Sequence, residues 1–138
     1  MNGQIPTGEI HHLRLTVSDV DRSRRFYTGL LGFAVAVESP PADDPSASVM
    51  SEILFGGIVM IRGNLLMGLR LVAPADDRFD EDRVGLDHLS FSVASRDDLE
   101  QAVALFDEQA CRTDRSPACP PSASTCCLSV TPTTFSWN

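Results

Sequence analysis

The chain contains no lysine, and this absence sets the character of its charge. Its 11 basic residues are all arginines and stand against 19 acidic residues, which gives a formal net charge of −8. The arginines do not gather in a basic stripe along the chain. An acidic protein of this kind is a poor match for nucleic acid or for an anionic membrane, so we expect neither as a partner.

Long apolar runs are also missing. No stretch approaches the roughly 20 apolar residues that a membrane-spanning helix needs. The first residues do not show the charged-then-apolar pattern of a signal peptide, so we expect a cytoplasmic protein. A chain of 138 residues with 43% hydrophobic residues is long enough for one domain with a substantial core.

Cysteine is absent from most of the chain. All four cysteines lie near the end, at Cys111, Cys119, Cys126 and Cys127. A disulfide framework would spread through the domain that it stabilises, and no pair here has a typical zinc-ligand spacing. We therefore interpret these cysteines as incidental. The sequence also lacks a glycine-rich phosphate loop, an EF-hand and a Ser-His-Asp signature.

One segment of the chain is repeated. Residues 10–17, which read IHHLRLTV, align position for position with residues 86–93, which read LDHLSFSV. Both copies alternate apolar and polar residues, and this pattern predicts a half-buried strand. Each copy carries a histidine at the same position, His12 or His88, on the face opposite the apolar residues. The repeat indicates two related halves, with the histidines in a site that the halves share.

The first copy of the repeat begins a unit that contains one helix. Ser18 and Asp21 resemble a capping box, and apolar residues at helical spacing predict a helix that ends near Gly32. A loop rich in proline and aspartate is expected over residues 39–48. Strands are predicted over residues 33–38, 51–55, 58–61 and 65–72, with a hairpin turn at residues 62–64. We interpret the unit as a βαβββ module, with one predicted strand more than the three that such a module has after its helix.

The second copy begins a second unit. Ser95 and Asp98 repeat the cap, and Leu99, Ala102, Val103 and Phe106 form the apolar stripe of a predicted helix. From Ala110 onward the composition changes and strand periodicity disappears, so the three strands that should follow are not expected. We predict a single α+β domain with these parts: a first module over residues 8–73, a linker over 74–84, the start of a second module over 85–109 and an atypical tail over 110–138.

The tail permits two interpretations. Its content of Ser, Thr, Pro and Cys is typical of a disordered segment. A shifted reading frame would also produce it, because the last base of the Trp137 codon and the first two bases of the Asn138 codon spell GAA, a glutamate codon. The codons before them are compatible with a turn and an alternating strand. We favour the shifted frame and predict a small insertion or deletion near codons 108–110.

Several motifs together resemble a known family. The segments are residues 12–19 with the first strand histidine, Phe26-Tyr27, residues 31–33 with Leu-Gly-Phe, and residues 85–93 with the second histidine. This combination resembles the vicinal oxygen chelate superfamily, which includes glyoxalase I, bleomycin and fosfomycin resistance proteins and extradiol dioxygenases. The resemblance covers about residues 8–109. It implies a glyoxalase-like fold of paired βαβββ modules, a cleft around a divalent metal, a small-molecule ligand and a homodimer.

The resemblance also implies a metal site. His12 and His88 match the two family histidines, and the family takes a third ligand, a carboxylate, from the last strand of its second module. Two imidazoles and a carboxylate suit Fe, Mn, Zn or Ni, with open positions for the paired oxygens of a substrate. Such a metal acts as a Lewis acid. The translated chain has no counterpart of the carboxylate, and its strand over residues 67–72 has no Glu or Gln where glyoxalase I has a ligand.

Three functional hypotheses follow from these observations. The first is a metal-dependent lyase, isomerase or dioxygenase that acts on a small oxygenated molecule. The second is a metal-free binding protein of the bleomycin-resistance type, and the third is an inactive, truncated copy. Arg14 and Arg70 are predicted to bind an anionic substrate, with salt bridges to acidic residues as the alternative. His11 is expected on the opposite strand face from His12, and Phe26 and Tyr27 in the helix core.

Overall fold

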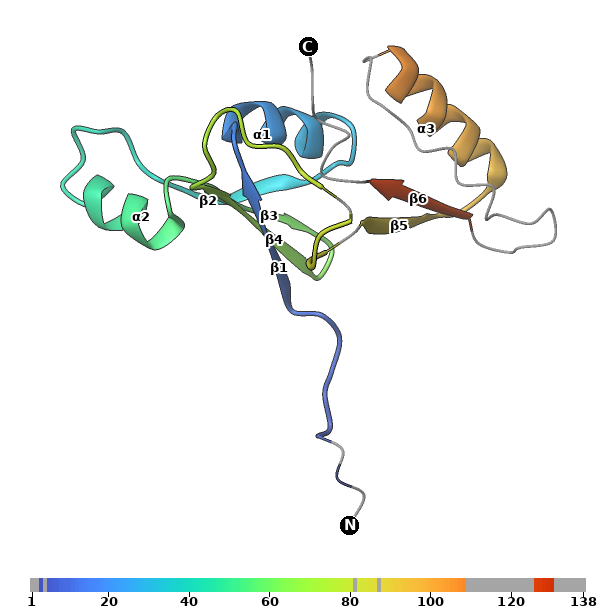
Figure 1. Cartoon of the computed structure of the whole chain (residues 1–138), viewed down its shortest axis with the longest axis horizontal. Coiled ribbons are helices and arrows are strands. Elements are labelled where there is room, and N and C mark those ends of the chain that lie inside the picture. The colour runs from blue at the N-terminus through green and yellow to red at the C-terminus, as the bar shows by residue number, and fades with distance from the viewer. Residues whose placement is uncertain (1–2, 4, 81, 87, 109–125, 131–138) are drawn as a thin grey trace. The chain divides into compact units, whose positions relative to one another are not determined.

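The structure is a computed structural model that describes the chain except for residues 1–2, 4, 81, 87, 109–125 and 131–138. The described residues form an α+β fold, as predicted, with helices placed between strands (Figure 1). The chain divides into two compact units, Met1–Asp77 and Arg78–Asn138. Each unit is described by itself below. None of the described helices is long and apolar enough to cross a membrane.

The first unit is built on a four-stranded sheet. Its strands are β1 (His12–Val17), β2 (Ala34–Glu38), β3 (Ile58–Arg62) and β4 (Leu65–Leu71). They lie in the order β1-β4-β3-β2, so β1 and β2 are the edge strands. β1 pairs with β4 in parallel, whereas the β2–β3 and β3–β4 pairs are antiparallel. The hairpin turn that joins β3 to β4 lies where the sequence predicts it.

The core of this unit lies between one face of the sheet and helix α1 (Val20–Gly29). Met60, Met67 and Leu69 are less than 2% exposed and come from the two central strands. Helix α1 contributes Phe26 and Tyr27, which are buried as predicted. Burial raises the pKa of the Tyr27 phenol, so its hydroxyl is protonated at neutral pH.

The cap of α1 corrects the sequence prediction by one residue. The N-cap is Asp19, whose Oδ1 accepts a hydrogen bond of 2.8 Å from the backbone N–H of Arg22. Ser18 does not make this bond. In the aligned repeat Asp19 corresponds to Ser95. Ser95 caps the helix of the second unit, because its hydroxyl accepts a 3.1 Å hydrogen bond from the N–H of Asp98. The two caps therefore occupy the same repeat position, with an aspartate in one unit and a serine in the other.

A second helix in this unit replaces a predicted strand. Residues 51–55 were expected to be extended, but the structure has helix α2 (Ala47–Leu54) in their place. A short apolar run does not distinguish a strand from a helix by its periodicity. Here only Leu54 is buried, and Val49 and Ile53 are exposed on the helix surface. The sheet therefore reaches its four strands without this segment, and α2 is an insertion between β2 and β3.

The second unit repeats the start of the first. It contains β5 (Leu89–Val93), α3 (Arg96–Glu108) and β6 (Cys126–Val130), and β5 and β6 pair in an antiparallel ladder. Phe106 of the predicted apolar stripe is buried. The expectation that no strand follows the helix is wrong, because β6 forms in the tail from a short run that includes leucine and valine. The described part of this unit has two strands, so the prediction of an incomplete second module is confirmed.

Candidate functional site

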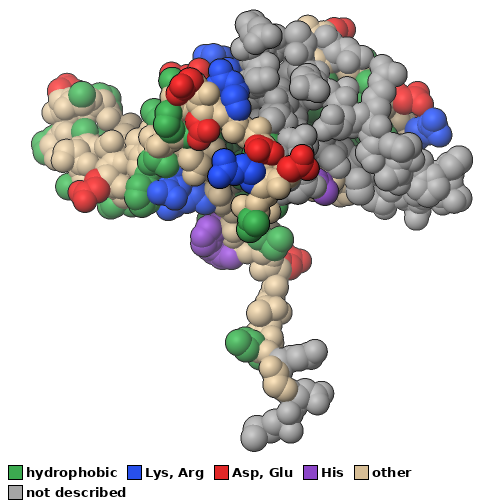
Figure 2. All heavy atoms as spheres, in the orientation of Figure 1, with side chains coloured by type: hydrophobic (Ala, Val, Ile, Leu, Met, Phe, Trp, Pro, Cys, Tyr) green, Lys and Arg blue, Asp and Glu red, His purple; other side chains and the backbone are tan. Residues whose placement is uncertain are grey.

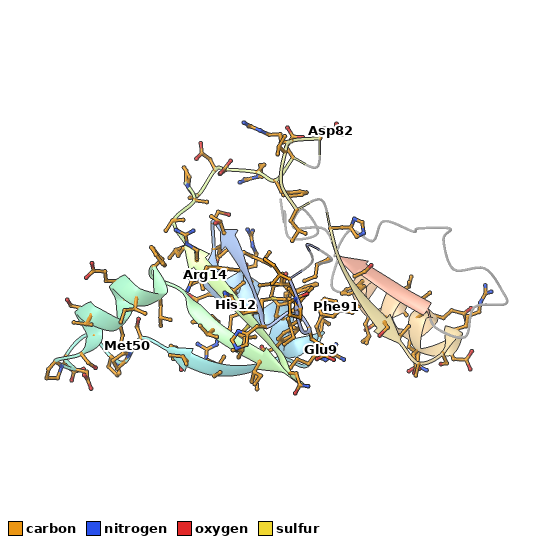
Figure 3. All side chains as sticks on the ribbon, turned by 90° about the horizontal axis from the view of Figure 1, so that it is seen from below. Glu9, His12, Arg14, Met50, Asp82 and Phe91 are labelled. Atoms are coloured by element: carbon orange, nitrogen blue, oxygen red, sulfur yellow. The ribbon has the colours of Figure 1, made fainter. Side chains whose placement is uncertain are left out.

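The sheet of the first unit presents one face that α1 does not cover. Along β1 the side chains alternate, with Leu13 and Leu15 half-buried and with His12, Arg14 and Thr16 exposed. The parallel register places Arg14 beside Gly68 and Thr16 beside Arg70, so Arg70 lies on this exposed face as well. Figure 3 labels His12 and Arg14 on β1, and Figure 2 shows histidine and arginine side chains close together on the surface. We call this the open face of the sheet.

His12 makes an imidazole pair at the start of β1. Its Nδ1 lies 3.0 Å from the Nδ1 of His11, and the two rings are almost perpendicular, with centroids 5.3 Å apart. This pairing corrects the expectation that His11 points to the other strand face. His11 precedes β1 and is outside the pleat, so the period-two alternation does not apply to it. If Nδ1 of His12 donates the shared proton, its Nε2 has a lone pair available for a metal or a substrate.

Arg14 and Arg70 meet at a phenylalanine. The Cζ of Arg70 lies 4.2 Å from the ring centroid of Phe55, and the Cζ of Arg14 lies 5.3 Å from it. Both distances are within the range of a cation–π interaction. Neither guanidinium forms an ion pair in the described part of the chain, where the acidic residues were the alternative partners. Their role in binding a substrate stays a prediction. The sequence pattern does not predict the part that Phe55 plays, because contact between these three side chains depends on the turn after α2.

Phe55 has an unusual backbone conformation. It follows α2 with φ of 54° and ψ of 43°, the left-handed region that costs a residue with a side chain about 1–2 kcal/mol. Two hydrogen bonds hold it there: its N–H donates to the carbonyl of Glu52 over 3.2 Å, and its carbonyl accepts from the N–H of Leu71 over 3.1 Å. The Phe-Gly-Gly sequence at residues 55–57 is a signal for a tight turn, although it does not predict the arginine contacts.

His88 lies in the second unit, exposed and directly before β5. The structure brings Arg14 and Arg70 together and places His12 on the same face, but it describes His88 only within its own unit. No group of three His, Cys, Asp or Glu side chains is positioned to hold a metal within the described ranges. These residues alone therefore do not fit a complete transition-metal site, which needs at least three protein ligands. The glutamate of the shifted frame is absent from the translated chain.

Comparison with known proteins identifies the family. The family model of the Glyoxalase/Bleomycin resistance protein/Dioxygenase superfamily matches residues 9–124, which is most of the chain. This is the vicinal oxygen chelate superfamily that the sequence motifs resemble. Neither the curated proteins nor the solved structures gave a match. The match includes His12, His88 and the whole of the first sheet.

Proposed function

The chain belongs to the Glyoxalase/Bleomycin resistance protein/Dioxygenase superfamily, and on this basis we propose that it binds a small oxygenated molecule on the open face of its first sheet. One observation carries the proposal: polar His12, Arg14 and Arg70 share a face of the sheet. Leu13 and Leu15 of β1 and Met67 and Leu69 of β4 lie on the opposite face. Imidazole and guanidinium donors on a rigid sheet can orient the oxygen atoms of a ligand. Binding itself is the function that the geometry supports best.

The second candidate function is metal-dependent chemistry on the same molecule. The repeated position of His12 and His88 favours it, with Fe, Mn, Zn or Ni as the metal. When bound, such a metal supplies Lewis-acid stabilisation of a developing oxyanion. Within the described residues, His12 is not part of a group of three His, Cys, Asp or Glu side chains that could hold a metal ion. The metal-free alternative needs only the open face, and an inactive copy would have neither property.

An isothermal titration of the full chain separates these functions. The probe is catechol, an uncharged molecule with two neighbouring oxygens, added with and without Mn²⁺ or Zn²⁺. Binding proteins of both kinds should take up catechol and lose affinity in His12→Ala, with Ser18→Ala as a control on the same segment. A metal-dependent protein should also bind one equivalent of metal, and both His12→Ala and His88→Ala should abolish that uptake. If neither catechol nor salicylate, the second probe used below, binds under either condition, the proposed function is wrong.

We also propose that the tail after codon 108 is read in a shifted frame. The forced glutamate at the last codon would supply the carboxylate that the family takes from its second module. Nucleotide sequences of close relatives test this directly. Relatives whose proteins end in the same Ser, Thr and Cys tail would contradict it, and relatives with an alternating strand that ends in glutamate would support it.

A homodimer is the final part of the proposal. Both edge strands of the first sheet, β1 and β2, lack a partner strand on their outer side within the described residues. Such edges favour pairing with another chain. Light scattering on the eluting peak of a size-exclusion column gives the mass in solution, and a mass near the 15.0 kDa of one chain would refute the dimer.

A further inference from the structure

We propose that Arg14, Phe55 and Arg70 form a clamp for the carboxylate of a small organic acid. This inference rests on the proposed function, since it names the chemical class of the ligand that the open face takes. The clamp is a feature of this chain's own side chains. The two guanidiniums lie within 5.3 Å of the centroid of the same phenyl ring, that of Phe55.

Gly68 leaves the space that the Arg14 side chain occupies on its way to the Phe55 ring. A Cβ atom on Gly68 would lie 3.3 Å from Nε and 3.5 Å from Cγ of Arg14. The arginine side chain therefore lies across β4 at the one position where that strand has no side chain of its own on the open face. Any larger residue would need Arg14 to move. The guanidinium is thus directed along the sheet surface toward Phe55 rather than out into solvent.

Arg70 has hydrogen-bonding capacity that the described residues do not use. Its Nε is buried and has no hydrogen-bond partner among them. A buried N–H without an acceptor costs about 1–3 kcal/mol, more for a charged group. Phe55 compensates part of the positive charge, but a phenyl ring offers no oxygen or nitrogen acceptor to the donors. The terminal nitrogens of the guanidinium carry four further N–H donors, so the clamp favours a ligand that carries an acceptor with negative charge.

A planar carboxylate fits these donors well. Guanidinium groups bind carboxylates through two parallel N–H···O bonds, and this geometry gives both energy and orientation. The surroundings favour an organic body over a bare ion, because Val59 and Ile61 of β3 pair with Gly68 and Leu66 and so lie on the same face as Arg14. Ile61 is 38% exposed and available for contact.

The position of His12 sets the size of the ligand. Residues two apart on a strand point to the same face at a spacing of about 6.6 Å. A carboxylate held by Arg14 and Arg70 therefore places the rest of a small acid next to His12. A hydroxyl or carbonyl oxygen on the atom beside the carboxylate would face that imidazole. The predicted ligand class is a small acid with a second oxygen near its carboxylate.

Isothermal titration of the full chain with salicylate tests the clamp. Salicylate has a carboxylate beside a hydroxyl, and salicylamide is its uncharged counterpart. We expect Arg14→Gln and Arg70→Gln each to weaken salicylate binding about tenfold or more, and salicylamide to bind the unchanged protein about tenfold more weakly than salicylate. Arg24→Gln removes the same charge from α1, where Arg24 pairs with Glu38, and should change salicylate affinity less than twofold.

Gly68→Val separates geometry from charge. It keeps both guanidiniums but occupies the space in which Arg14 lies, so salicylate binding should weaken about tenfold while thermal unfolding shows that the variant is folded. The clamp is overturned if Arg24→Gln has the same effect as Arg70→Gln, or if inorganic phosphate binds more tightly than salicylate. Catechol distinguishes the two proposals: catechol binding without salicylate binding refutes the clamp alone, and binding of neither refutes the proposed function as well.

Discussion

The two units of this protein begin alike and continue differently. Each starts with a strand that is followed by a helix, and the caps of the two helices, Asp19 and Ser95, occupy the same position of the repeat. The first unit then adds three strands and closes a core around Met60, Met67 and Leu69. The described part of the second unit adds one strand, β6. The repeat therefore specifies how a unit starts, while the residues after the helix decide whether a sheet with an open face is formed.

The largest expected effect comes from the core of the first unit. Met67→Ala removes a fully buried side chain from the centre of the sheet and should lower the free energy of unfolding by about 2–5 kcal/mol. Leu71→Ala, on the same strand but 41% exposed, is the control and should cost less. Urea unfolding measures both. Equal losses would mean that the first unit does not have the specific core described here.

The next largest loss of stability is expected at Gly57, where the backbone before β3 lies very close to the backbone of β4. A Cβ atom on Gly57 would lie 1.7 Å from the carbonyl oxygen of Leu69, so Gly57→Ala forces the start of β3 away from β4. We expect a loss of about 1–3 kcal/mol in thermal or urea unfolding. Gly29→Ala is the matched control, because nothing lies within 4 Å of the added atom at the end of α1. If the two variants are equally stable, the packing of β3 on β4 is wrong.

The sequence predicted this fold unevenly, for physical reasons. Alternation and helical spacing placed β1, α1, β5 and α3, because each buries one face more than the other. The pattern failed at α2, a short apolar segment whose exposed Val49 and Ile53 give no periodic signal of burial. It failed at His11 because that residue lies outside the strand. The polar face of β1 could be predicted from the sequence. The contact of Phe55 with two arginines could not, because it depends on the left-handed conformation of Phe55, which the Phe-Gly-Gly turn signal does not specify.

The helix caps sharpen the comparison between the units. Asp19→Ala and Ser95→Ala remove equivalent hydrogen bonds, so each should cost about 1 kcal/mol of helix stability. Ser18→Ala should cost less than either, since Ser18 does not cap α1. Hydrogen exchange of the first-turn amides reports each helix separately. A larger loss of α1 stability in Ser18→Ala than in Asp19→Ala would instead support Ser18 as the cap, as the sequence suggested.

The smallest predicted effect is a pH-dependent contribution of Asp44, which lies just before α2, to the stability of the fold. Asp44 Oδ1 accepts hydrogen bonds from the hydroxyl and the backbone N–H of Ser46, at 2.6 and 2.8 Å, and these bonds lower the pKa of the carboxyl. A lowered pKa in the folded state gives stability that is present above the pKa of the unfolded chain, about 3.9, and is lost as the pH falls through the folded value. Asp44→Ala should therefore be less stable than the unchanged protein near neutral pH, and the difference should vanish in acid. A difference that grows in acid would contradict this assignment.

The most direct measurement is a map of ligand contacts by two-dimensional NMR of the uniformly ¹⁵N-labelled chain, titrated with catechol and then with salicylate. The account predicts that the shifted amides belong to the strand centres around Arg14, Gly68 and Arg70, with those of α1 unmoved. Shifts confined to α1, or to the second unit without any change on the first sheet, would show that small oxygenated molecules do not bind where the two arginines and His12 share a surface.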